Sequence, residues 1–321
     1  MSPRYRSTGA GKPAGPGRSP ASSGQPVGGA AVVVIHLPAS PASPAPPLED
    51  PMSLRRTGIT GLFLGVLALL GALPAAADPG PSGVSYVAMG DSYSAGLGAG
   101  GSGDSCARTA NAYPALWAAA NRPAAFASLA CSGATAASVA ADQVSALPAD
   151  TTLVSVTIGG NDVGFSTIMQ TCALHRTSDC LATVAAAEKV ARTALPGRLD
   201  ALYTAISARA PRARVVVLGY PDFYRLHVWY CVGLGGAARA KIDEGIDVLD
   251  EVTATAAAAH GFTFVDVRPA FADHQLCSGH KWLHAVDFAH LTESYHPTVD
   301  GQSQGYLAAF TAAVGGADRI G

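Results

Sequence analysis

The segment Val84-Ser-Tyr-Val-Ala-Met-Gly-Asp-Ser-Tyr-Ser-Ala-Gly96 decides how the rest of the chain is interpreted. Its apolar run, residues 84–89, predicts a buried strand that ends at Gly90-Asp91-Ser92. A serine just beyond a strand end in an α/β domain lies on the side of the sheet where such domains bind ligands. Ser92 is therefore a candidate nucleophile, although a serine or aspartate at this place also caps helices.

The chain beyond this segment alternates between strand-like and helix-like patterns. We predict strands at residues 84–89, 125–130, 153–158, 215–218 and 262–267. We predict helices at residues 113–121, 135–145, 183–210, 237–260 and 301–314, with Pro196 marking a break or a new first turn. This alternation indicates βαβ units, and hence an α/β fold: a three-layer α/β/α sandwich around a five-stranded parallel sheet. The expected strand order is the flavodoxin-like 2-1-3-4-5.

Four longer segments lie outside these elements and are expected to be loops: residues 96–109, 165–180, 220–236 and 271–291. The last two are rich in Trp, Tyr, Phe and His. Loops at strand ends commonly build binding walls, and an apolar wall would suit an acyl chain. The same aromatic residues would also serve as ordinary core packing.

Three further polar motifs follow in chain order. Cys131-Ser-Gly-Ala-Thr135 comes after the second predicted strand, and Thr157-Ile-Gly-Gly-Asn-Asp162 ends the third. Ser294-Tyr-His-Pro297 precedes Gly301-Gln302, where the last helix begins. The order Ser, Gly, Asn, His resembles the SGNH (GDSL) hydrolase family, particularly the secreted lipases and esterases of actinobacteria. The resemblance covers the chain from about Val84 to the C-terminus and implies an SGNH hydrolase fold.

The resemblance assigns a role to each of these residues. Ser92 would be the nucleophile and His296 the base that takes its proton, since imidazole titrates near working pH. The oxyanion donors would be the N–H groups of Ser92 and Gly133 and the side-chain amide of Asn161. Each has a plainer alternative, because glycine and asparagine are also ordinary turn residues.

Two features near the C-terminus leave alternatives open. His290 follows Asp287 by three residues, a spacing that the family often uses, so it competes with His296 as the base. The family's usual aspartate is Glu293 here. Either the Glu293 carboxylate or, as in actinobacterial relatives, the carbonyl of Ser294 would orient His296, giving a triad or a dyad.

The N-terminal region differs in composition from the rest. Residues 1–51 are dominated by Pro, Gly, Ser and Ala and are expected to be disordered. We expect Met52 to be the true start, with residues 1–51 added by a start codon placed too early; the alternative is a genuine extended leader. Residues 52–77 carry two arginines, an apolar run and small residues, as in a secretory signal peptide. The apolar run is too short for a confident membrane span. The hydrolase domain would occupy residues 78–321, and the protein would be extracellular.

Six cysteines lie in this last region: Cys106, Cys131, Cys172, Cys180, Cys231 and Cys277. An even number in an exported chain favours disulfides over a zinc site, but six cysteines allow fifteen pairings. The resemblance implies pairing of neighbours in order: Cys106–Cys131, Cys172–Cys180 and Cys231–Cys277.

Composition, charge and motifs argue against some classes of function. The formal net charge is −2, and no basic patch indicates nucleic acid. No motif for a metal or a cofactor is present, so none is expected. The resemblance implies hydrolysis of carboxylic esters through an acyl-enzyme and favours lipid acyl esters. Phospholipase A1 activity occurs within the same group. The alternatives are a carbohydrate acetyl esterase and a catalytically silent binding domain. We expect a monomer.

Overall fold

The computed structural model describes residues 82–101 and 103–315. The predictions for residues 1–51 and 52–77 therefore lie outside the described residues. All described residues belong to one unit of the chain, Ala72–Gly321.

The centre of this unit is a five-stranded sheet, and all four strand pairs are parallel. The strands are β1 (Ser82–Gly90), β2 (Pro123–Ser128), β3 (Leu153–Thr157), β4 (Arg214–Leu218) and β5 (Thr263–Val265). Their order is β2-β1-β3-β4-β5, so the predicted α/β class and strand order are confirmed. β3 is buried along its whole length because helices cover both faces.

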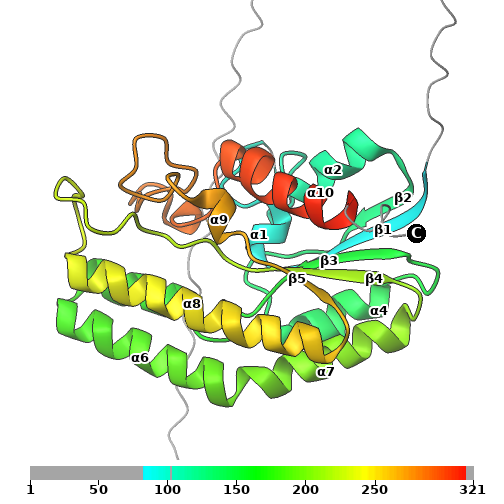
Figure 1. Ribbon diagram of the computed structural model, residues 1–321, viewed down its shortest axis with the longest axis horizontal. Helices are drawn as coiled ribbons and strands as arrows, with labels where there is room; N and C mark the ends of the chain where they lie inside the picture. Colours follow the sequence, from blue (N-terminus) through cyan, green and yellow to red (C-terminus); the bar gives the residue numbers. More distant parts are fainter. Residues whose placement is uncertain (1–81, 102, 316–321) are drawn as a thin grey trace, which may run out of the picture. The chain divides into compact units, whose positions relative to one another are not determined.

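Helices lie on both faces of the sheet (Figure 1). On one face are α2 (Tyr113–Asn121) and α10 (Leu307–Gly315), the latter continuing a π-helical turn, η3 (Gly301–Tyr306). On the other are α6 (Thr177–Thr193), α7 (Leu195–Arg209) and α8 (Gly236–Ala259). A broken helix completes this layer, made of α3 (Ala136–Ser138), the π-turn η1 (Val139–Gln143) and α4 (Val144–Ala146). α7 buries five side chains at helical spacing against the core: Leu195, Leu199, Leu202, Tyr203 and Ile206.

The prediction of a loop over residues 165–180 is wrong. This segment forms α5 (Phe165–Leu174) and the first turn of α6. Phe165, Ile168, Met169 and Cys172 recur at the spacing of an amphipathic helix and pack against the core. The helical periodicity was therefore present in the sequence but was not used in the prediction.

Smaller differences concern element ends. β2 begins at Pro123, two residues before its predicted start, and β5 is shorter than predicted. The long helix of residues 183–210 is two helices, because the chain changes direction at Ala194 and Pro196 occupies the first turn of α7.

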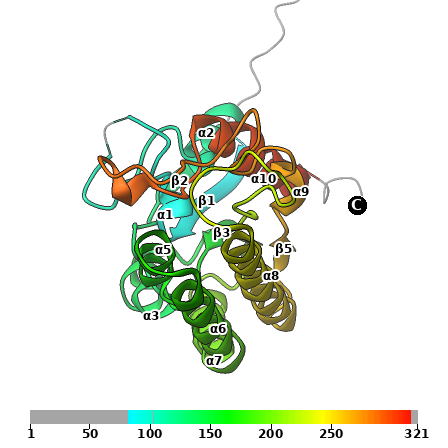
Figure 2. The same ribbon diagram turned by 90° about the vertical axis from the view of Figure 1, so that its left-hand side faces the viewer.

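The aromatic loops divide between the two roles considered for them. Phe223, Tyr224 and Phe271 are buried in the core, whereas Trp229 and Phe288 are largely exposed. Figure 2 views the molecule from the end where these loops gather, which is also the carboxyl end of the strands.

The three disulfides pair the cysteines as the resemblance implied: Cys106–Cys131, Cys172–Cys180 and Cys231–Cys277. The first fastens the loop before α2 to the loop after β2, and the second joins α5 to α6. The third connects the two aromatic loops. The bridges therefore stabilise the end of the molecule where strands become loops.

We expect removal of the longest-range bridge to cost the most stability. Cys231–Cys277 spans 46 residues and Cys172–Cys180 spans 8. Loop-closure entropy gives about 4 kcal/mol for the first and about 2.5 kcal/mol for the second. Chemical denaturation of the two double Cys→Ser variants measures the difference. Equal unfolding free energies of both variants and the wild type would contradict this expectation.

Candidate active site

Ser92 is the first residue of the short helix α1 (Ser92–Ala95), directly after β1. The Asp91 carboxylate caps this helix by accepting a hydrogen bond from the Tyr93 N–H at 3.0 Å. Gly96 ends the helix in the left-handed conformation. The nucleophile predicted from sequence thus stands on one tight turn at the carboxyl end of the sheet.

His296 meets Ser92 across 204 positions of sequence, with its Nε2 atom 2.8 Å from Ser92 Oγ. Its Nδ1 atom lies 3.1 Å from the carbonyl oxygen of Ser294. A carbonyl only accepts hydrogen bonds, so Nδ1 carries the proton. In the neutral ring Nε2 is then an acceptor for the Ser92 hydroxyl, which is the arrangement that proton removal requires.

The two alternatives at this end of the chain are placed elsewhere. His290 and Asp287 do form a pair, Nδ1 to Oδ2 at 2.9 Å, but both side chains are mostly exposed. Glu293 ends a 3₁₀ turn, η2 (Leu291–Glu293), and contacts His296 through its main-chain carbonyl, which accepts the His296 N–H at 3.0 Å. The group beside the ring nitrogen is the Ser294 carbonyl.

Burial controls the basicity of His296. Removal of the ring from water lowers its pKa from 6.5 to about 4, and the hydrogen bond to the Ser294 carbonyl opposes this only partly. The ring is therefore neutral at pH 7 and able to accept a proton.

The predicted oxyanion donors line the same groove as Ser92 and His296. Gly133 has a φ of +82° and open space where a Cβ would stand, so its main chain faces the groove unobstructed. The Asn161 amide donates one hydrogen bond to the carbonyl of Ala134 at 2.9 Å. This contact fixes the direction of the amide and ties the loop after β3 to the loop after β2, leaving the second amide proton for a ligand.

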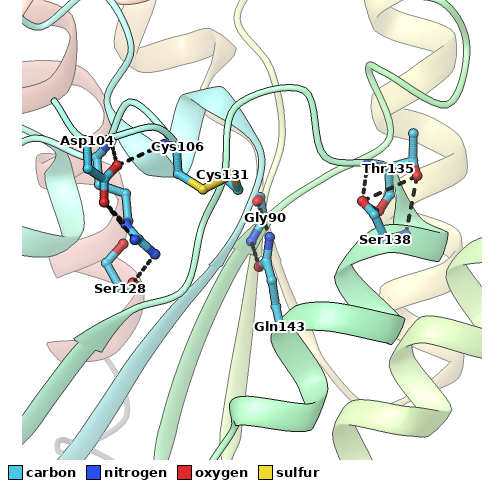
Figure 3. Close-up of a disulfide and its surroundings, with 9 residues drawn as sticks. Gly90, Asp104, Cys106, Ser128, Cys131, Thr135, Ser138 and Gln143 are labelled. Carbon is cyan, nitrogen blue, oxygen red and sulfur yellow. Dashed lines mark hydrogen bonds and ion pairs between the residues drawn. A yellow bond between two sulfur atoms is a disulfide. The ribbon is translucent and has the colours of Figure 1, made fainter.

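The sequence analysis missed Gln143, which holds the strand end before Ser92. Its side-chain amide accepts from the Gly90 N–H and donates to the Gly90 carbonyl, both at 2.8 Å (Figure 3). Gly90 has a φ of +116°, and a Cβ there would lie 2.2 Å from the Thr157 carbonyl oxygen. No other residue fits this position, and nothing local in the sequence marks Gln143 as its partner.

Tyr93 and Gln302 connect the serine and histidine segments. The Tyr93 hydroxyl donates to the carbonyl of Tyr295 at 2.7 Å, next to His296 in the chain. Gln302 donates to the Tyr93 carbonyl at 3.0 Å and accepts from the Tyr113 N–H. Tyr295 itself has a φ of +67°, a strained conformation that these contacts and its burial maintain.

Asp91 also anchors Tyr220, whose hydroxyl donates to the second carboxylate oxygen of Asp91 and accepts from the Gly160 N–H. Burial raises the pKa of Asp91 to about 7, although the Tyr220 hydrogen bond lowers it. Both oxygens of Asp91 are engaged, so this carboxyl group holds the turn rather than facing the groove.

The groove has a volume of about 530 Å³. Apart from Ser92, His296 and the oxyanion donors, its walls are mostly apolar, with contributions from α5 and from the loop of residues 286–295. The contributing apolar side chains include Leu97, Phe165, Met169, Leu174, Val286, Phe288 and Leu291.

Comparison with known proteins identifies the family. The model of the GDSL-like lipase/acylhydrolase family matches residues 88–304. The chain belongs to this family. As a member of the GDSL-like lipase/acylhydrolase family it is a carboxylic ester hydrolase, and the resemblance inferred from sequence is confirmed.

Several relatives in the family come from Streptomyces. Lipase 1 of Streptomyces coelicolor is 50% identical over 253 residues, which cover 78% of this chain and 91% of that protein. A lipase of Streptomyces rimosus is 48% identical and is covered completely, against 82% of this chain. Two crystal structures also match this chain: the extracellular lipase of Streptomyces rimosus and the phospholipase A1 of Streptomyces albidoflavus. Each superposes with a TM-score of 0.70 over 72% of this chain and 99% of its own.

We expect the acid limb of the pH profile to lie well below pH 6.5. A histidine base works only when neutral, and the pKa of His296 is about 4, so kcat/KM should persist at pH 5 and fall as the pH approaches 4. An unperturbed imidazole would be only about 3% neutral at pH 5. The measurement is kcat/KM for a soluble ester between pH 3.5 and 8, with His290→Gln as control, since His290 is exposed. An apparent pKa of 6.5 or above would contradict the assignment.

The Glu293 carboxylate is expected to contribute little to catalysis, because the Ser294 carbonyl faces the ring nitrogen. Glu293→Gln should change kcat/KM by less than about threefold, whereas loss of a triad carboxylate costs about 10⁴ in other serine hydrolases. Steady-state kinetics at pH 7 checks this. A loss of several hundredfold or more would mean that the carboxylate, and not the carbonyl, orients His296.

Proposed function

We propose that this protein is a secreted serine hydrolase of lipid acyl esters that acts through a Ser92–His296 dyad and an acyl-enzyme. The observation that carries the proposal is the 2.8 Å contact between His296 Nε2 and Ser92 Oγ at the floor of an apolar groove. A neutral imidazole in this position turns an unreactive hydroxyl into a nucleophile.

In the first half of the proposed reaction, Ser92 Oγ attacks the ester carbonyl carbon while its proton moves to His296 Nε2. The Ser294 carbonyl keeps Nδ1–H oriented and stabilises the imidazolium that forms. The negative oxygen would receive hydrogen bonds from the N–H groups of Ser92 and Gly133 and from the free amide proton of Asn161. These donors are held in place before substrate arrives, so little reorganisation is needed.

Collapse of this intermediate breaks the bond to the alcohol oxygen, which takes the proton from His296 and leaves. Water then gives a proton to His296 and attacks the acyl carbon, and the serine recovers its proton as the carboxylic acid departs. The sequence of steps uses no cofactor.

The surface around the groove favours a lipid substrate. Among the described residues, six of the eight exposed large hydrophobic side chains lie on α5 or on the loops of residues 220–236 and 271–291: Leu174, Trp229, Tyr230, Val232, Phe288 and Leu291. A polysaccharide offers little apolar surface to cover them, whereas the rest of a lipid molecule or a lipid aggregate would do so. This distinguishes the proposal from the acetyl esterase alternative.

The relatives support the finer parts of the proposal. One is named a phospholipase A1 and another an extracellular lipase, so phospholipid esters and an extracellular location are proposed for this chain as well. The three disulfides suit an oxidising compartment. A signal peptide at residues 52–77, a mature start at Asp78 and a monomeric state complete the proposal. No helix within residues 82–101 and 103–315 is long and apolar enough to cross a membrane.

Ser92→Ala should abolish hydrolysis of p-nitrophenyl esters while leaving the thermal midpoint nearly unchanged, because only one hydroxyl is removed. Wild-type protein beginning at Asp78 should prefer medium or long acyl chains to acetyl. The assay is kcat/KM from acetyl to palmitoyl for both proteins. Turnover by the variant would exclude Ser92 as the nucleophile, and a strong acetyl preference would favour the carbohydrate esterase.

A further inference from the structure

Ser92 stands between two hollows and not beside one. One is the outer groove described above, and the other is a second, mostly apolar cavity lined by residues of α5, α6 and α8. Ser92 and Asn161 line both, and so do Phe165 and Met169 of α5, which form the wall between the two spaces. The inner cavity is much the smaller, about 50 Å³ against about 530 Å³.

The position of His296 distinguishes the two hollows chemically. His296 and Gly133 line the outer groove but not the inner cavity. His296 must reach the alcohol oxygen to protonate it as it leaves, so the alcohol side of the ester belongs in the outer groove. The acyl substituent of the same tetrahedral carbon points away from the leaving group, and the inner cavity is the space beside Ser92 and Asn161 that His296 does not line.

The walls of the inner cavity suit a hydrocarbon chain. α6 contributes Val184, Ala187 and Ala191, and α8 contributes Gly245 and Ile246. Small residues on the two helices leave the slot open, and a Cβ on Gly245 would lie 2.9 Å from a Val184 methyl group. The cavity's charged side chain away from Ser92 is Glu188, which is paired with Lys241 at 2.7 Å.

We infer that the inner cavity between α5, α6 and α8 binds the acyl chain, while the outer groove holds the alcohol portion of the ester. The inference rests on the proposed serine hydrolase function and adds the direction in which the substrate lies. The inner cavity is narrow and would admit an unbranched chain, with Phe165 and Met169 separating the acyl and alcohol portions of the substrate. Chain-length preference is then a property of the α6–α8 slot.

Substitutions on α6 test this assignment with a matched pair. Ala187 is buried and lines the cavity, whereas its neighbour Ala186 is exposed. Ala187→Leu should lower the octanoyl-to-acetyl ratio of kcat/KM for p-nitrophenyl esters by at least about tenfold, the effect of a methylene or more lost from an apolar pocket. Ala186→Leu should leave the ratio within about twofold. Ile246→Ala, which enlarges the slot, should raise the ratio.

An unchanged ratio in Ala187→Leu, with a lowered ratio in the outer-groove variant Ala173→Leu, would overturn the inference by placing the chain in the outer groove. That result still leaves an active ester hydrolase. Failure of the proposed function looks different: wild-type protein would then hydrolyse none of the esters.

A crystal structure of wild-type protein treated with p-nitrophenyl octylphosphonate tests the same point without any substitution. Ser92 Oγ bonds to phosphorus, p-nitrophenolate leaves, and the serine proton passes to His296. We expect the octyl chain between α6 and α8. An octyl chain lying along Phe288 and Leu291 in the outer groove would refute the assignment.

Discussion

The hydrogen bond between Ser92 and His296 joins residues 204 positions apart, and much of the surrounding structure serves to hold it. Neither residue is rigid by itself, since Ser92 starts a helix of one turn and His296 lies in an irregular segment. Tyr93 supplies the link, because its hydroxyl reaches the chain beside His296 and its carbonyl accepts from Gln302. Phe165 packs edge-on against the imidazole, with the ring centres 5.8 Å apart. The candidate site is thus built as a cross-linked set of loops on a rigid sheet.

The parallel sheet provides the common edge at which these loops start. β1 and β3 come so close at Gly90 that only glycine fits, and Gln143 then occupies both hydrogen-bonding groups of that residue. The loop after β3 is tied to the loop after β2 by the hydrogen bond from the Asn161 side-chain amide to the Ala134 carbonyl. The proposed nucleophile and the proposed oxyanion donors therefore share one framework, which keeps their relative positions independent of the substrate.

Burial is the largest influence on the pKa values of His296 and of the neighbouring Asp91. Desolvation lowers the pKa of His296 and raises that of the neighbouring Asp91, so both groups favour their neutral forms. A neutral base beside a carbonyl is a weaker proton acceptor than a histidine beside an aspartate, but it stays available at lower pH. Phe165, which packs against the imidazole ring, also lines both the outer groove and the inner cavity, so one side chain contacts the base and borders the space for a substrate.

Sequence by itself determined the class of fold and the strand order, because apolar runs ending in short polar motifs are local signals. The resemblance of those motifs to the family then singled out Ser92, Gly133, Asn161 and His296, which line one groove. Sequence analysis left both the Glu293 carboxylate and the Ser294 carbonyl open as the group that orients His296, and it overlooked α5, Gln143 and the inner cavity. Only the tertiary structure shows where these groups and this cavity lie. Whether a main-chain oxygen or a carboxylate faces a ring depends on the path of a loop, and a cavity depends on how far apart two helices pack. Both follow from contacts between distant parts of the chain, which leave no fixed spacing in the sequence.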